Sequence, residues 1–218
     1  MNIDTLVRKN IKNMSSYSSA RDDFKKENDN KLIYLDANES PFDNGINRYP
    51  DNNHTELKKV VSDIKNVNIN QVIFGNGTDE ILDLIVRVFC KPSEDKIITL
   101  PPTYGMYDVI AKTNKVENIE IPLKSDFSID KNEILKLSSS CIKILFLCSP
   151  NNPTGNSFDT NDLTDLIKGF NGVVVVDEAY IDFSSKQSLI SLINDNNNLI
   201  ITQTMSKAYG MAGIRLGM

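Results

Sequence analysis

The chain has 218 residues, of which 40% are hydrophobic and 24% are charged, a balance typical of a globular protein that buries a core. Its 24 basic and 29 acidic residues leave a net charge of −5. This charge argues against a nucleic-acid partner, because phosphate backbones are bound by clustered Lys and Arg. No apolar run reaches the roughly 20 residues of a membrane-spanning helix, so we expect no membrane segment.

Residues 1–14 have apolar side chains near helical spacing, without the apolar core and cleavage site of a signal peptide. The polar residues that follow predict a loop, and 32–42 reads as a short extended run. We therefore expect an N-terminal helix and arm over 1–30 and one large domain over 31–218.

The chain has three cysteines, Cys90, Cys141 and Cys148, and one histidine, His54. No Cys-x-x-Cys pair is present, and a single histidine argues against a His-based catalytic triad. We therefore expect reduced thiols in a cytoplasmic protein and no metal site.

A helix is predicted for 51–64, and from residue 71 onwards strands and helices alternate. The expected strands cover 71–77, 96–102, 116–122, 141–150, 172–183 and 199–206. The expected helices cover 78–90, 103–113, 130–140, 159–170 and 188–197. Several strands are apolar without alternation, as in strands covered on both faces. The pattern predicts an α/β fold, a three-layer α/β/α sandwich around a mostly parallel sheet.

Polar segments marked by Gly or Pro directly follow the predicted strands. They are GNGTDE (75–80), PPTYGMY (101–107), SPNNPTG (149–155), DEAY (177–180) and MSKAYG (205–210). In an open parallel sheet, the carboxyl ends of the strands border the ligand crevice. Ordinary loops explain one or two such segments, whereas five at the same edge indicate a site.

The segment GNGTDE can bind a phosphate. Gly75 and Gly77 allow a tight turn, and Thr78 or Asp79 can cap the next helix, whose positive end presents backbone N–H groups. A plain capped turn is the alternative. The segment matches neither a Walker A loop nor a GxGxxG fingerprint, which argues against a nucleotide-binding domain.

Asp177 directly follows a very apolar strand, so its carboxylate needs a partner if it is to stay charged. A protonated heteroaromatic nitrogen would be a suitable partner; a helix cap or a metal ligand are the alternatives. Tyr180 can donate from the same edge, Asn152 can donate to a phenolate-type oxygen, and Tyr104 can stack on a planar ligand. Each of these three also has an ordinary structural explanation, as a turn residue or a core aromatic.

Lys207 lies among Ala, Gly and Met residues, with Ser206 beside it and Arg215 eight positions on. A lysine amine near another cation can attack a carbonyl, and Ser206 with Arg215 can hold a phosphate. A surface lysine in a flexible loop is the alternative. Together, the phosphate site, the carboxylate, the donors, the stacking aromatic and the amine fit pyridoxal 5′-phosphate.

The motifs also carry a resemblance to a known family. LDANESPF, NRYPD, GNGTDEILDLIVRVFCKPSE, PPTYGMYDV, CSPNNPTG, VVVDEAYIDF and MSKAYGMAGIRLG occur in family order across nearly the whole chain. In these motifs the chain resembles the fold-type I, class II pyridoxal-phosphate-dependent aminotransferases. PPTYGMY and DEAYIDF favour the histidinol-phosphate aminotransferase branch.

The resemblance implies a role for each matching residue. Lys207 would bind the cofactor's aldehyde and then shuttle a proton, and Asp177 would keep the ring nitrogen protonated. Asn152 and Tyr180 would bind the ring oxygen, and Tyr104 would stack on the ring.

The implied phosphate ligands are Gly77, Thr78, Asp79, Ser206 and Arg215. Tyr49 resembles the tyrosine that reaches the phosphate across a homodimer interface. Tyr17 resembles a residue of the N-terminal arm near the substrate.

The implied reaction transfers an amino group between glutamate and imidazole-acetol phosphate in histidine biosynthesis. Histidinol phosphate and 2-oxoglutarate are then the other two substrates, and one shared site predicts ping-pong kinetics. Two alternatives stay open. One is another fold-type I enzyme, an aromatic aminotransferase or an amino-phosphate decarboxylase. The other is a fragment that binds the cofactor without turnover.

Members of this family continue well beyond the residue at which this sequence stops. The resemblance therefore implies that the large domain is incomplete at its C-terminal end and that the small C-terminal domain is missing. The last residues, IRLGM, read as the start of a strand. On this basis we expect a truncated chain that is weakly stable and has little transaminase activity.

Overall fold

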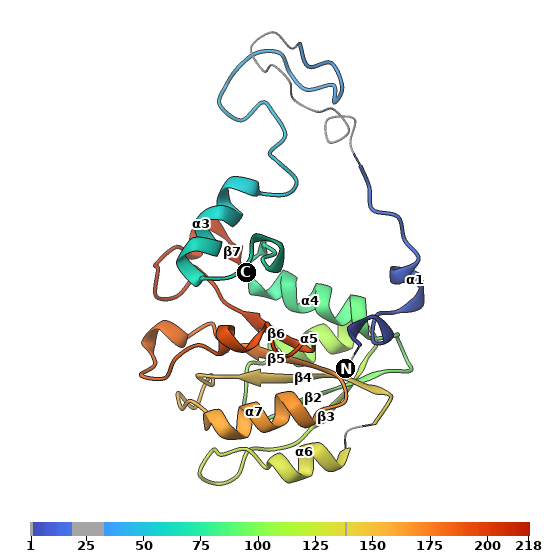
Figure 1. Ribbon diagram of the computed structural model, residues 1–218, viewed down its shortest axis with the longest axis vertical. Coiled ribbons are helices and arrows are strands. Elements are labelled where there is room, and N and C mark those ends of the chain that lie inside the picture. The colour runs from blue at the N-terminus through green and yellow to red at the C-terminus, as the bar shows by residue number, and fades with distance from the viewer. Residues whose placement is uncertain (1, 19–32, 138) are drawn as a thin grey trace. The chain divides into compact units, whose positions relative to one another are not determined.

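The computed structural model describes residues 2–18, 33–137 and 139–218 (Figure 1). Contacts group the chain into two compact units. The larger unit combines the residues up to Lys12 with Ile73–Met218, and the smaller unit is Asn13–Val72. The expected boundary at residue 30 lies outside the described residues and stays a prediction. In the described ranges, no helix is both long and apolar enough to cross a membrane.

The larger unit is built on a five-stranded sheet in the order β3-β2-β4-β5-β6. The strands are β2 Lys96–Thr99, β3 Glu117–Glu120, β4 Ile142–Cys148, β5 Val173–Asp177 and β6 Leu199–Thr202. All four neighbouring pairs are parallel, and every residue of β5 is buried. The predicted parallel sheet is thereby confirmed.

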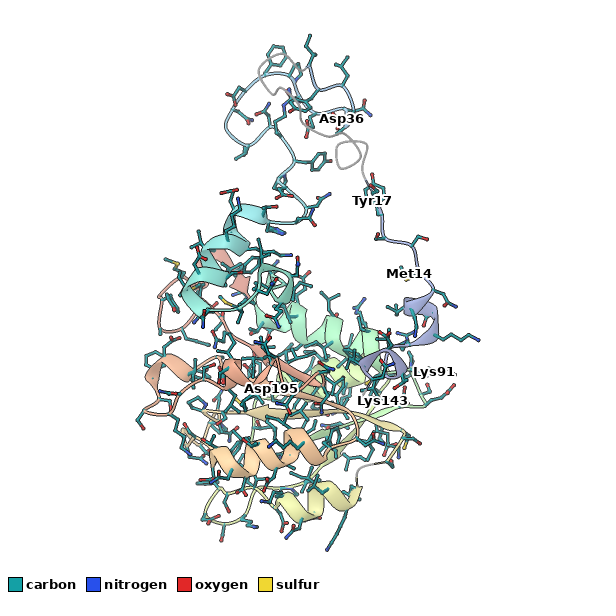
Figure 2. All side chains as sticks on the ribbon, in the orientation of Figure 1. Met14, Tyr17, Asp36, Lys91, Lys143 and Asp195 are labelled. Atoms are coloured by element: carbon teal, nitrogen blue, oxygen red, sulfur yellow. The ribbon has the colours of Figure 1, made fainter. Side chains whose placement is uncertain are left out.

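Helices cover both faces of this sheet (Figure 1). They are α4 Thr78–Phe89 and α5 Met106–Thr113 on one face, and α6 Lys131–Leu137 and α7 Thr160–Gly169 on the other. Successive residues of β4 serve the two cores in turn. Ile144 and Phe146 pack with α4 and α5, whereas Leu145 and Leu147 pack with α6 and α7. Side chains fill both layers (Figure 2), which confirms the three-layer sandwich.

A second, two-stranded sheet joins distant parts of the larger unit. β1 Gly75–Asn76 pairs antiparallel with β7 Leu216–Gly217. The strand expected over 71–77 is thus reduced to two residues and lies outside the parallel sheet. The glycines on either side of Asn76 lower the strand propensity here, and the chain turns at once into α4.

Two expected helices of the larger unit are shorter than predicted. The first residues form a 3-10 turn, Ile3–Thr5, and a four-residue helix, α1 Lys9–Lys12, in place of one helix to Met14. The helix expected over 188–197 is a 3-10 turn, Leu189–Leu192. Asn and Asp follow that turn, and such side chains compete for the backbone groups of a helix.

The smaller unit contains α3 Thr55–Lys65, as expected, and the 3-10 turn Ile69–Gln71. Its apolar face is only partly covered, because Val61 is buried while Val60 and Ile64 are 55% and 64% exposed. No strand is assigned to the described part of the extended run expected over 32–42.

Candidate active site

A pocket of the larger unit gathers residues from β4, β5, α4 and the segment after β6. It is lined by Gly77, Thr78, Asp79, Tyr104, Cys148, Asp177, Ala179, Tyr180, Thr204, Ser206, Lys207 and Arg215. All but Cys148, Ala179 and Thr204 are candidates from the sequence. Ala179 lies within the predicted segment DEAY, and Cys148 and Thr204 directly precede two other predicted segments. Nothing in the sequence marked these three side chains as ligand-binding. GNGTDE reaches this pocket although β1 is not part of the parallel sheet.

Asp177 ends β5 and is 2% exposed. Tyr107 donates its hydroxyl to Oδ2 at 2.8 Å, and Thr202 donates to Oδ1 at 3.1 Å. Burial raises the pKa of the Asp177 carboxyl, and these hydrogen bonds offset part of that rise. A buried carboxylate that faces a pocket is suited to a cationic ligand group.

Tyr104 and Asp79 are joined by a hydrogen bond in the pocket wall. The Tyr104 hydroxyl donates to Asp79 Oδ1 at 3.0 Å. Burial and this bond raise the pKa of Tyr104 to about 12, so the phenol stays protonated at neutral pH. The expected helix cap is wrong in detail, because the cap of α4 is Gly77, with no side-chain hydrogen bond, and Thr78 is the first helical residue.

Lys207 and Arg215 lie on one hairpin loop. Gln203 and Met218 exchange two backbone hydrogen bonds, and Met205 N donates to Leu216 O, so the loop between them is held at both ends. The Lys207 amine lies 5.3 Å from the centroid of the Tyr180 ring, within reach of a cation–π contact. Both cations line the pocket with exposed side chains, which leaves them accessible to a ligand.

Close packing at the start of α4 requires glycine at two positions. Gly77 has φ +75°, and an added Cβ would lie 2.5 Å from Arg215 Nη2. A Cβ at Gly217 would overlap the backbone of Gly77 and Thr78. The guanidinium therefore lies against the first turn of α4. An N-terminal helix end and an arginine together are a donor set suited to a phosphate.

Three candidates from the sequence do not line this pocket. Asn152 follows β4 and is half-buried, while its neighbour Asn151 is the buried one. Asn151 binds Pro102 O and the Thr154 hydroxyl through its amide nitrogen. Tyr17 and Tyr49 belong to the smaller unit, where both are exposed, and Figure 2 marks Tyr17 just after Met14.

Glu178, next to Asp177, joins segments of the fold through hydrogen bonds. Its carboxylate accepts hydrogen bonds from Gln203 Nε2 at 2.8 Å, from the Ser188 hydroxyl at 2.5 Å and from Leu189 N at 2.8 Å. It thereby ties the end of β5 to the strand that leads into the Lys207 loop. No group of three or more His, Cys, Asp or Glu residues in the described ranges is arranged to hold a metal ion.

Residues 26–218 match the family model of aminotransferase class I and II. The chain belongs to this family. Histidinol-phosphate aminotransferase of Flavobacterium psychrophilum is 57% identical over 216 residues, which make up 99% of this chain and 62% of that protein. This member of the aminotransferase family thus spans less than two thirds of the length of that relative.

Solved structures agree with the family and the fold. Histidinol-phosphate aminotransferase of Clostridium acetobutylicum superposes with a TM-score of 0.69 at 26% identity, over 78% of this chain and 51% of that chain. The Sinorhizobium meliloti enzyme, solved in complex with pyridoxal 5′-phosphate, gives a TM-score of 0.71 at 23% identity, over 78% of this chain and 47% of that chain. At that identity the second likeness shows the fold alone.

Proposed function

We propose that this chain binds pyridoxal 5′-phosphate and takes part in amino transfer between glutamate and imidazole-acetol phosphate. One observation carries the proposal. A buried carboxylate, Asp177, lines the same pocket as an amine, Lys207, and a guanidinium, Arg215. A pyridine aldehyde that carries a phosphate needs a carboxylate for its ring nitrogen, an amine for its aldehyde and a cationic group for its phosphate.

The pocket fits the cofactor by its donor set, in which the Arg215 guanidinium lies against Gly77 at the start of α4. When bound, pyridoxal phosphate supplies an electron sink for bonds at an amino acid's α-carbon. Asp177 would hold the proton on the ring nitrogen, and Lys207 would attach the aldehyde and carry a proton at Nζ. Tyr104 would flank the ring, and Asn152 with Tyr180 would bind the ring oxygen.

The phosphate would be held through backbone N–H groups at the start of α4 and by two side chains. The proposed ligands are Gly77, Thr78, Asp79, Ser206 and Arg215. The Asp79 carboxylate accepts from Tyr104, so its contribution to an anion comes from its backbone N–H. These roles remain proposals, as do those of Tyr49 toward the phosphate and Tyr17 toward the substrate.

We also propose a homodimer in the cytoplasm. Large apolar side chains of the smaller unit are exposed, as expected of a surface that a second copy covers. They include Ile33, Leu35, Phe42, Ile46, Val60 and Ile64. The three cysteines are free, in keeping with a reducing compartment.

Reductive trapping tests cofactor binding. The chain is mixed with pyridoxal phosphate and reduced with borohydride, and the labelled peptide is identified by mass spectrometry. We expect the label on Lys207 and its loss in Lys207→Arg. Lys186→Arg is the matched control, because Lys186 donates to Phe158 O at 2.7 Å and does not line the pocket. Label on another lysine, or none, would overturn the proposal.

Substrate assays test the reaction. Histidinol phosphate with 2-oxoglutarate is compared with aromatic amino acids on the same protein. Turnover by this chain should be low, and we expect exchange of the amino group to be faster with histidinol phosphate than with the aromatic amino acids. A preference for aromatic amino acids would indicate an aromatic aminotransferase, and release of carbon dioxide would indicate a decarboxylase.

A further inference from the structure

Tyr107 makes a buried contact that the proposed roles leave unexplained. It lies in the first turn of α5, is 1% exposed, and donates its hydroxyl to Asp177 Oδ2 at 2.8 Å. We propose that Tyr107 is a positioning residue that keeps the Asp177 carboxylate ionised and oriented for the ring nitrogen of the cofactor. The inference rests on the proposed function, which gives Asp177 that ligand.

Three donors hold the two oxygens of Asp177. Tyr107 of α5 donates to Oδ2, while Thr202 at the end of β6 and the backbone N–H of Ala179 donate to Oδ1 at 3.1 and 3.2 Å. A carboxylate with donors on both oxygens cannot turn without breaking a hydrogen bond. Thr202 has no exposed surface, so water cannot readily replace its hydroxyl.

The core fixes the position of the Tyr107 ring. Its ring stacks on Phe146, with centroids 4.8 Å apart and an interplanar angle of 6°. It is nearly perpendicular to the Tyr104 ring, at 87° with centroids 5.6 Å apart, and Tyr104 lines the pocket. Phenylalanine would fill the same space and keep both ring contacts. The tyrosine hydroxyl is therefore the only part of this side chain that the packing does not require.

Several titratable groups surround Asp177. They are Asp79 of α4, Tyr104 and Tyr107 of the α5 segment, Cys148 of β4, and Tyr180, Lys207 and Arg215 of the pocket wall. Burial raises the pKa of Asp177, hydrogen bonds from Tyr107 and Thr202 lower it, and the charge of Asp79 raises it. Burial also raises the pKa of Tyr107 well above its usual value, so its hydroxyl remains a donor at neutral pH.

Loss of the Tyr107 hydroxyl should shift the pKa of Asp177 in one direction. Without this donor the carboxyl pKa of Asp177 rises. In an acid titration, Asp177 is therefore protonated at a higher pH than in the unaltered chain. A neutral carboxyl no longer pairs with a protonated ring nitrogen. The acid side of the pH profile for cofactor binding should therefore move to higher pH.

Two measurements on the whole chain test this. The carboxyl titration of Asp177 is followed by carbon-13 NMR without cofactor, with the resonance assigned by its loss in Asp177→Asn. The dissociation constant for pyridoxal phosphate is measured from pH 5 to 8. In Tyr107→Phe we expect two transitions to move to higher pH: the titration of Asp177 and the acid limb of the cofactor-binding profile. On that acid limb, cofactor binding should be about tenfold weaker. Thr202→Val should move both transitions in the same direction.

Ile85→Ala is the control for a purely structural role. It removes buried side-chain volume from the same core cluster and lowers stability, and Ile85 is not a donor to Asp177. We expect the two transitions to stay where the unaltered chain has them. If Tyr107→Phe does not fold, 3-fluorotyrosine at position 107, a stronger donor, should move both transitions to lower pH.

The outcomes separate the inference from the function. An unchanged Asp177 titration in Tyr107→Phe overturns the inference, and so does a titration that moves while the binding profile stays. An equal shift in Ile85→Ala would assign the effect to packing. Failure of the unaltered chain to bind cofactor would instead overturn the proposed function, while the titration would still report on the Tyr107 contact.

Discussion

At the scale of single residues, Gly77 shows how one missing side chain shapes the site. Its φ of +75° favours glycine, and its Cα hydrogen faces the Arg215 guanidinium. The backbone N–H of Gly77 also donates to Arg215 O at 2.7 Å. The residue thus brings the start of α4 and the arginine together.

Gly77→Ala should weaken pyridoxal phosphate binding about tenfold or more, because the new Cβ displaces the guanidinium from the helix end. Gly155→Ala is the matched control. It has the same φ of +75° but nothing within 4 Å of an added Cβ, so only the backbone cost of about 1 kcal/mol applies. Equal cofactor affinity in the two variants, measured by titration, would contradict this prediction.

Asp177 should limit stability as well as support function. Its pKa is raised in the folded chain, so the stability it contributes is present below the unfolded value of about 3.9 and is lost as pH rises through the folded value. Asp177→Asn removes this pH dependence, so the free energy of unfolding of the variant, relative to that of the unaltered chain, should be higher at pH 7 than at pH 4.

Urea unfolding at the two pH values measures this effect. The same variant should bind pyridoxal phosphate about 10- to 100-fold more weakly, because the charged partner of the ring nitrogen is gone. A relative stability that does not rise between pH 4 and pH 7 would show that burial is not the dominant influence on the pKa of Asp177.

The sequence predicted the residues with distinctive chemistry but not their supports. Asp177, Lys207 and Arg215 stand out because a charged side chain follows an apolar strand or lies among small residues. Tyr107 and Thr202 do not stand out, since an aromatic in a helix and a threonine in a strand are ordinary core residues. Only the three-dimensional structure shows that their hydroxyls meet Asp177.

At the scale of elements, the carboxylate of Glu178 links three segments that surround the pocket. It accepts from Gln203, Ser188 and Leu189, so the end of β5, the 3-10 turn Leu189–Leu192 and the end of β6 share one buried group. The Lys207 loop begins three residues after Gln203. The position of that loop therefore depends on Glu178.

Glu178→Gln should lower the free energy of unfolding by about 2–3 kcal/mol. The new amide NH₂ would face donors that now bind a carboxylate oxygen. Glu133→Gln, on the exposed face of α6, should change it by less than about 0.5 kcal/mol. Chemical denaturation of both variants measures the difference, and equal values would argue against a buried network at Glu178.

Element boundaries were predictable where apolar residues dominate. β4, α4 and α7 match their expected ranges closely, because their burial follows directly from the pattern of apolar side chains. β5 ends at Asp177, six residues before the end of the strand expected over 172–183, and Ile181–Phe183 forms a 3-10 turn instead. The pairing of β1 with β7 was not predictable, since two-residue strands of Gly, Asn and Leu carry no periodicity. Antiparallel contact between such short segments depends on tertiary packing.

At the scale of the whole molecule, the smaller unit has the exposed apolar surface that a second copy would cover. Val60 and Ile64 are four residues apart on α3 and therefore share one helix face. Val60→Lys with Ile64→Lys should weaken self-association by at least tenfold, measured by sedimentation.

Val109→Lys on α5 is the control, because this residue is also exposed and apolar but belongs to the larger unit. It should leave the association constant unchanged. A chain that stays monomeric before any substitution would refute the proposed dimer.

The antiparallel pair of β1 and β7 closes the larger unit across its longest stretch of sequence. Gly75 is opposite Gly217, and the pocket takes residues from Gly77 at one end of that stretch to Arg215 at the other. During synthesis, the cofactor pocket therefore stays incomplete until the hairpin that carries Lys207 and Arg215 has left the ribosome. Pyridoxal phosphate would then bind late in folding, and it would stabilise only those chains in which β1 and β7 have already paired.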